Sequence, residues 1–127
     1  MVTNAGADFS LYIGPIVAYG GTKAGAGTVY RQRAADRSGR GSVLLGNNSY
    51  SAGYTDVPPY TNYLTGEVEF SPFHITNAAT LRLTNDFMLG DIWLDSTNAC
   101  LDLGSNTLTV RSRPHSLGPG IVTNFGE

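Results

Sequence analysis

The sequence has few of the residues from which catalytic and metal-binding sites are usually built. Its 127 residues include a single cysteine, Cys100, which excludes an internal disulfide and any zinc site with several cysteine ligands. Charged residues make up only 14% of the chain, compared with about 25% in a typical soluble domain. The two histidines lie far apart in the sequence and no G-x-S-x-G motif occurs, so no nucleophilic triad can be assembled from the sequence.

The same shortages argue against two kinds of partner. Eight basic and ten acidic residues give a net charge of −2, and the densest group of arginines is diluted by Asp36 and by glycines. Nucleic-acid binding normally requires a stronger basic surface, so no nucleic-acid partner is predicted. No run of about 18 apolar residues occurs, so no membrane span is predicted either. The N-terminus lacks a basic stretch followed by an apolar run, so an export signal is expected only in a longer parent protein.

The residues that are abundant favour strands and turns. There are 16 glycines, 41% of the residues are hydrophobic, and asparagine, serine and threonine are frequent. Such a composition is poor in helix formers and rich in residues found in strands and turns. The length suits one domain, so residues 1–127 are interpreted as a single module. Short strands are expected at 9–13, 28–32 and 42–45.

Residues 47–72 are interpreted as a long loop rich in tyrosine and proline. The segment carries Pro58, Pro59 and Pro72 together with four tyrosines, and it shows no regular alternation. Loops of this length within a compact domain are often functional. Two interpretations stay open: a flap whose tyrosines pack against an otherwise exposed face, and a binding loop.

Residues 73–125 contain an internal repeat. At a spacing of 20 residues Leu81 aligns with Leu101, and after one inserted residue Phe87 aligns with Leu108. Asn85 falls above Asn106, which suggests a ladder of amides at a corner. Each unit alternates apolar and polar residues and then turns, as one coil of a solenoid requires. Since a single coil cannot bury its apolar side, stacked copies would be needed to form a core.

The predicted fold class is therefore all-β, a single-stranded parallel β-solenoid. An antiparallel β-sandwich or jelly roll is the alternative, because it would also show short alternating strands separated by turns.

Several stretches carry a family resemblance, which covers about two-thirds of the chain and excludes the tyrosine-rich loop. Residues 25–32 look like a G-A-G-T-[IV]-Y segment, 39–48 like the strand and turn that follow it, and 79–83 with 100–110 like an A-T-L-x-L … L-D-L-G-x-N-T-L-T-V repeat. Residues 115–127 are similar to coil-to-coil connections. Together these stretches resemble the autotransporter-like, repetitive exported β-helix proteins of bacteria. The resemblance implies a right-handed β-helix, an extracellular or cell-surface location and a module of a longer protein. It brings no catalytic residues with it.

Aromatic residues are the candidate ligand-binding side chains. An aromatic ring can cover the apolar side of a sugar ring while a phenol hydroxyl bonds to the sugar's hydroxyls. The candidates for polysaccharide binding are Tyr50, Tyr54, Tyr60, Tyr63 and Trp93. For each single tyrosine the competing interpretation is packing within a flap.

Carboxylates provide two further hypotheses. Asp91 and Asp95 lie four residues apart in a short strand and would share a face, so they are the candidate catalytic pair of a polysaccharide-cleaving enzyme. Oxygen-bearing side chains near turns could hold calcium, although no calcium-binding repeat motif is present; the four in question are Asn85, Asp86, Asp102 and Asn106. Solvated surface and turn residues are the simpler interpretation of both groups, and no cofactor is predicted.

The function expected from the sequence is that of a non-enzymatic structural or adhesive module of a large exported protein. Its partners would be copies of itself or neighbouring coils of a parent protein, because stacked coils leave unpaired strand edges at their ends. A carbohydrate-binding module that uses the tyrosine-rich loop is the first alternative, and a polysaccharide-cleaving enzyme is the second.

Overall fold

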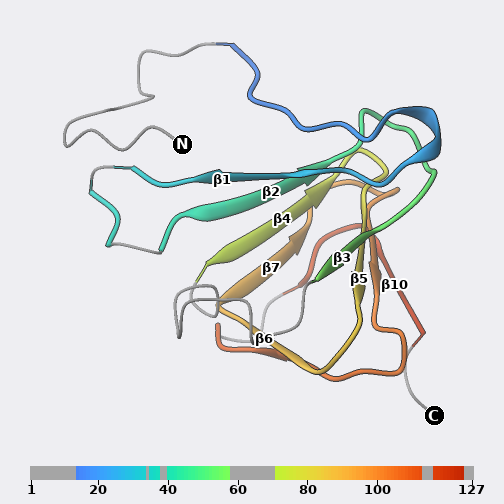
Figure 1. Cartoon of the computed structure of the whole chain (residues 1–127). Coiled ribbons are helices and arrows are strands. Elements are labelled where there is room, and N and C mark those ends of the chain that lie inside the picture. Colours follow the sequence, from blue (N-terminus) through green and yellow to red (C-terminus); the bar gives the residue numbers. More distant parts are fainter. Residues whose placement is uncertain (1–13, 34, 38–39, 58–70, 113–115, 125–127) are drawn as a thin grey trace.

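The computed structural model describes residues 14–33, 35–37, 40–57, 71–112 and 116–124 (Figure 1). The regular structure of the described residues is almost entirely strand, with a single 3-10 turn, η1, at Gly21–Lys23. Ten short strands follow: β1 Thr28–Arg31, β2 Ser42–Gly46, β3 Thr55–Val57, β4 Pro72–Thr76, β5 Thr80–Leu83, β6 Phe87–Leu89, β7 Asp91–Leu94, β8 Cys100–Asp102, β9 Leu108–Val110 and β10 Ile121–Thr123.

The strands belong to three sheets. The first has the order β1-β2-β4-β7, the second β10-β8-β5-β3, and the third consists of β6 and β9. The pairing of β1 with β2 is antiparallel, whereas each of the other six pairings is parallel. The first sheet is therefore mixed and the other two are parallel.

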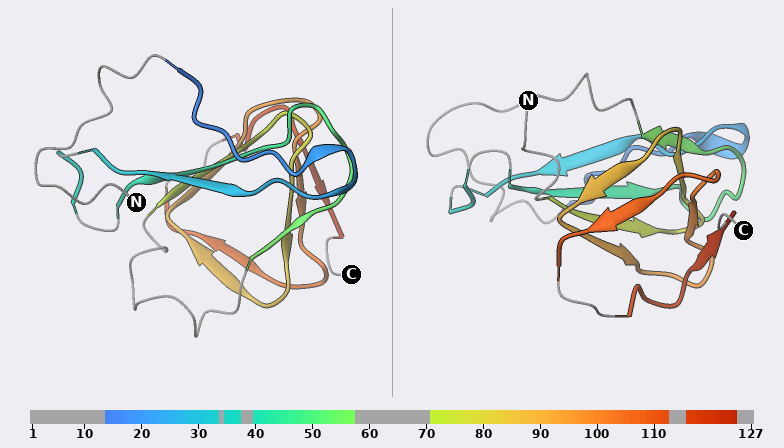
Figure 2. Two further views of the ribbon diagram at one scale, coloured as in Figure 1. Left: turned by 45° about the horizontal axis from the view of Figure 1, so that its top comes forward. Right: turned by 90° about the horizontal axis from the view of Figure 1, so that it is seen from below.

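Neighbours in a parallel pair come from successive layers of chain. One layer contains β4, β5 and β6, and the next contains β7, β8 and β9, each stacked on its counterpart (Figures 1 and 2). Strands β2 and β3 lie before these two layers, and β10 lies after them. The aligned residues of the sequence repeat are direct neighbours: Leu81 pairs with Leu101, and Phe87 with Leu108. That alignment is confirmed.

The predicted fold class is nevertheless wrong. A single-stranded parallel β-solenoid would have only parallel strand pairs, but β1 lies antiparallel on β2, so the strands form one mixed and two parallel sheets. The antiparallel sandwich or jelly roll is also wrong, because six of the seven pairings are parallel. The physical reason is local: the short polar connection between β1 and β2 allows a hairpin, and hairpins are antiparallel.

The alternating sequence of each strand places its apolar residues in a common core. In β4, Phe73 and Ile75 are buried while His74 between them is partly exposed. Successive side chains of a strand point to opposite faces, and aromatic and β-branched residues suit this geometry. Leu45 of β2, Ile75 of β4 and Leu94 of β7 are each at most 1% exposed. The middle of the stack is thus closed to solvent.

Side chains at the corners join one layer to the next. The side-chain amide of Asn106 donates to the carbonyl of Leu83 in the preceding layer, at 3.1 Å, and the Asn98 side-chain oxygen accepts from the amide of Ala78 at 3.1 Å. The expected ladder between Asn85 and Asn106 does not form, because the Asn85 amide donates to the carbonyl of its own neighbour Asp86. The corners therefore connect layers by side-chain-to-backbone bonds.

The N-terminal end of the stack is covered by the segment before β2. The side chain of Asn47 is buried and accepts from the Gly20 amide at 2.9 Å, while it donates to the carbonyls of Ala24 at 3.1 Å and Tyr50 at 2.7 Å. Ala26 of the same segment is buried in the core. Asn47 thus fastens this covering segment to the turn that follows β2.

Candidate functional site

The described ligand-binding aromatics that the sequence predicts lie on different parts of the fold. Tyr50 and Tyr54 are exposed, at 39% and 51%. Tyr60 and Tyr63 lie outside the described residues. Trp93 lies on β7 in a different sheet, and its indole nitrogen donates to Asp91 Oδ2 at 3.1 Å. Part of the predicted loop is a strand, since β3 occupies Thr55–Val57.

Tyr54 belongs to a small cluster on the outer face of the second sheet. The guanidinium carbon of Arg82 lies 3.3 Å from the centre of the Tyr54 ring. Arg82 Nε donates to Asp56 Oδ1 at 2.7 Å, and Arg82 Nη2 donates to Asp56 Oδ2 at 3.0 Å. The hydrogen bonds that Arg82 donates to Asp56 are the main cause that raises the pKa of Arg82 above its ordinary value. Arg82 also lies beside Asp102 in the register of β5 and β8. This cluster presents a ring, a cation and carboxylates to solvent.

The two candidate catalytic aspartates each have their own partners. Asp95 Oδ2 lies 2.9 Å from His74 Nδ1 of β4. Asp91 accepts from the Trp93 indole, from the Ile92 amide at 2.8 Å and from the Ser112 hydroxyl at 3.0 Å. The contacts of both carboxylates join β7 to neighbouring segments.

The oxygen-bearing residues named for calcium also make contacts within the chain. Asp86 Oδ1 accepts from the Thr107 amide at 2.8 Å, and Asp102 Oδ1 accepts from the Gly104 amide and the Asn124 side chain. Within the part of the chain that the structure describes, no three histidine, cysteine, aspartate or glutamate side chains gather as a metal site would require.

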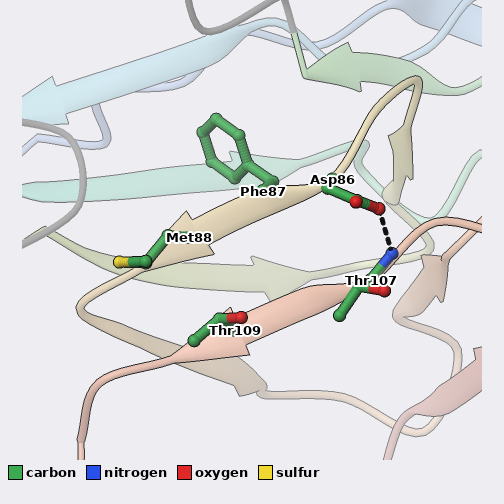
Figure 3. A pocket seen from close by; sticks show the side chains of 5 residues that line it. All are labelled: Asp86, Phe87, Met88, Thr107 and Thr109. Carbon is green, nitrogen blue, oxygen red and sulfur yellow. Dashed lines mark hydrogen bonds between the residues drawn. The ribbon is translucent and has the colours of Figure 1, made fainter.

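A shallow pocket of about 320 Å³ lies against the third sheet (Figure 3). Met88 of β6 and Thr109 of β9 lie side by side in the register and line it, with Phe87, Asp86 and Thr107. Its single carboxylate is the one already bonded to the Thr107 amide, as the dashed line in Figure 3 shows. The pocket offers an apolar wall and two hydroxyls, which is a sparse set of groups for catalysis.

The C-terminal end of the stack differs from the middle because its apolar side chains are only partly buried. Leu81 and Leu101 are each 1% exposed, but the next residue in their row, Val122 of β10, is only partly buried. Buried Leu89 likewise has a partly buried neighbour in Val110. We call this surface the end face; its partly buried apolar residues are Leu103, Leu108, Val110, Leu117 and Val122.

Among the strands that the structure describes, the strand at the rim of the end face has one open side. Within that set β10 pairs with β8 alone, through the Ile121 amide to the Ala99 carbonyl at 2.9 Å and the Leu103 amide to the Thr123 carbonyl at 3.1 Å. Backbone groups alternate sides along a strand, so the amide and carbonyl of Val122 point away from β8. The adjacent Ile121 side chain is 53% exposed on the outer face. Sequence reasoning missed β10, although Ile121-Val122-Thr123 is a short β-branched run between turn residues.

Two glycines hold the last segment against the preceding layer. Gly118 has a φ of 107°, and a Cβ there would collide with the Leu94 carbonyl. A Cβ at Gly120 would meet the Leu94 side chain and the Ala99 carbonyl oxygen. The close approach lets the Leu94 amide donate to the Leu117 carbonyl at 2.6 Å. The end face is thus a fixed part of the fold.

In comparisons with known proteins, no family model, no curated protein and no solved structure matches the chain. The described residues contain no helix that is long and apolar enough to cross a membrane.

Proposed function

We propose that the chain is a non-enzymatic structural or adhesive module of a large secreted or cell-surface protein, and that further strands add to it at the end face. The observation that carries the proposal is the loss of burial along the apolar rows. Leu81 and Leu101 are sealed from solvent, while Val122, the third member of the row, is not. A further strand paired with β10 would bury Val122, as β10 itself buries Leu101 of β8.

Two driving forces favour such an addition. Each 100 Å² of apolar surface removed from water contributes roughly 2.5 kcal/mol. The open backbone groups of an edge strand also bind an incoming strand, a mode by which many proteins recruit partners. Edge strands that must stay alone usually carry lysine, proline or inward-pointing charge, and β10, which reads Ile121-Val122-Thr123, carries none of these. The end face therefore offers apolar surface and open backbone groups for association, and β10 carries no residue of the kinds that keep edge strands unpaired.

The setting in an exported protein is supported by the sequence alone. The chain resembles repetitive exported bacterial proteins over residues 25–32, 39–48, 79–83, 100–110 and 115–127, and it is solubilised by amides and hydroxyls more than by charge. The chain has few charged residues, and side-chain-to-backbone hydrogen bonds join its layers at the corners. Such a chain suits a spacer or stalk, which has to hold its shape and needs no reactive groups.

The proposal is tested by sedimentation velocity over a concentration series. The variant Ile121→Lys places a charge on the open edge at a side chain that is already 53% exposed, so folding should be unaffected. The matched control is Val17→Lys, which alters another β-branched residue, 47% exposed, in the covering segment of the opposite end. We expect the unmodified chain and the control to associate and Ile121→Lys to stay monomeric. Equal behaviour of all three would overturn the proposal.

Carbohydrate binding is a second candidate, favoured by the cluster of Tyr54, Arg82 and Asp56. The ring is half exposed and the charged groups beside it are fixed by two hydrogen bonds, so it can offer a stacking surface and hydrogen-bonding groups together. Retention on insoluble polysaccharides tests it: Tyr54→Ala should reduce retention, while Tyr30→Ala, which removes a similarly exposed tyrosine from β1, should not. Equal retention of the two variants would contradict this function.

A further inference from the structure

We infer that the partner at the end face is a second copy of this chain, docked end face to end face about a two-fold axis, so that β10 of one protomer pairs antiparallel with β10 of its partner. This inference rests on the proposed function and adds the identity of the partner and the geometry of the contact. Three features of the molecule support it: the opposite end is covered, the edge of β10 fits its own copy, and the segments that hold β9 and β10 carry no charge.

A head-to-tail partner would have to dock at the N-terminal end, which is covered. β1 lies antiparallel on β2 and occupies the edge to which an added strand would bind. On the second sheet the hydroxyl of Thr55, the first residue of β3, donates to the Ala26 carbonyl of the covering segment. Asn47 holds this segment with bonds to Gly20 and Ala24. A head-to-tail contact would therefore require the segment to leave, whereas the end face needs no rearrangement.

The open edge of β10 fits its own copy. A two-fold axis that lies beside β10 at the level of Val122 sets Val122 opposite its own copy, and the amide and carbonyl that point away from β8 then bond reciprocally across the axis. Both Val122 side chains face inward, where each closes the row of the other protomer. Ile121 of one protomer lies opposite Thr123 of the partner on the outer face, as a closely spaced pair without backbone hydrogen bonds.

The segments that would meet in the pair carry no charged side chains. A two-fold contact places each segment beside its own copy, so any charge in it would face a like charge. Residues 116–124, which read Ser-Leu-Gly-Pro-Gly-Ile-Val-Thr-Asn, contain no charged side chain, and neither does β9 at Leu108–Val110. The two segments that hold β9 and β10 are thus neutral, although Arg111 directly follows β9, while the chain as a whole contains 18 charged residues. This neutrality is what a self-complementary contact requires.

The consequence is a closed pair. Once two end faces meet, the covered N-terminal ends of the described stack face outward, so two-fold docking gives a closed pair of this chain. A head-to-tail contact would instead leave one open end on each assembly and lead to filaments.

Disulfide trapping tests the geometry. Cys100 Sγ lies 3.7 Å from Thr123 Oγ1, so all variants carry Cys100→Ser to prevent an internal bond with a new cysteine at position 123. Ile121→Cys and Thr123→Cys are prepared separately, mixed and oxidised mildly. We expect a covalent dimer in the mixture and little in either variant alone, because only positions 121 and 123 of opposite protomers are near enough to bond. The mixture of Ile121→Cys with Lys23→Cys, an exposed position in η1 at the covered end, should give none.

The unmodified chain provides a measurement that does not depend on any variant. Sedimentation equilibrium should approach twice the monomer mass of 13.5 kDa and stay there as the concentration rises. Continued growth, or a disulfide between positions 121 and 23, would overturn the two-fold pair and leave the proposed function intact. A monomer at every concentration would overturn both.

Discussion

Val122 lies beside Leu101 in the parallel pairing of β10 with β8, in the row where Leu101 itself lies beside Leu81. The three side chains share one face of the second sheet, yet the two leucines are 1% exposed and Val122 is only partly buried. The row is thus sealed in its middle, while its last described member is the place where a further strand could pack. The middle, the covered end and the open end contribute differently to stability and association.

The middle of the stack should carry most of the stability. Leu101→Ala removes a side chain that is 1% exposed and packed between β5 and β10, so it should lower the free energy of unfolding by about 2–5 kcal/mol. Val17→Ala, at a side chain that is 47% exposed, should change it by less than about 0.5 kcal/mol. Urea denaturation followed by circular dichroism measures both. A similar small loss for both variants would mean that the layers are not packed as described.

The cover at the N-terminal end should depend on Asn47. Asn47→Ala leaves the Gly20 amide and the carbonyls of Ala24 and Tyr50 without this partner, and we expect a loss of roughly 2–4 kcal/mol because several hydrogen bonds to a buried side chain disappear together. Hydrogen exchange should rise first in the covering segment. Ser51→Ala, at an exposed residue four positions further on, is the control and should exchange like the unmodified chain. Unchanged exchange in the Asn47 variant would contradict the role of this side chain.

The last segment should loosen when Gly118 is replaced. Gly118→Ala places a Cβ against the Leu94 carbonyl at a φ of 107°, which costs about 1–3 kcal/mol of strain at that point. The Leu94 amide, which donates to Leu117, should lose protection from exchange while β5 and β8 keep theirs. In the control Gly46→Ala the added Cβ meets the Thr76 side chain at 3.5 Å, an ordinary contact. Equal protection at Leu94 in both variants would show that the glycine is not needed there.

The sequence allowed part of this fold to be predicted, namely the part with a regular spacing. Leu81 and Leu101 are 20 residues apart, and Phe87 and Leu108 are 21 apart, and both pairs are neighbours in the register. Val43 and Phe73 are also neighbours, but they are 30 residues apart, so the same stacking was hidden from a search for one constant period. The antiparallel pairing of β1 was missed for another reason: its sequence suits a strand of either direction, and the partner is decided by the length of the connection.

The candidate site was less accessible to sequence reasoning than the fold. Whether a valine lies in the middle of a row or at its end depends on what is stacked on it, so Val122 does not differ from Leu101 in sequence pattern. Thr55–Val57 escaped detection because three residues with one central aspartate show almost no alternation. The pairing of His74 with Asp95 joins residues 21 apart, and only the register of β4 and β7 brings them together.

The central claim is that the open edge of β10 is covered by a partner strand, and the most direct test is the hydrogen exchange rate of the Val122 amide as a function of protein concentration. The Leu101 amide, in the interior strand β8, serves as the internal reference and should be protected at every concentration. We predict that the Val122 amide exchanges freely in dilute solution and becomes protected as the chain is concentrated, in step with the increase in sedimenting mass. Free exchange of Val122 at all concentrations would contradict the account.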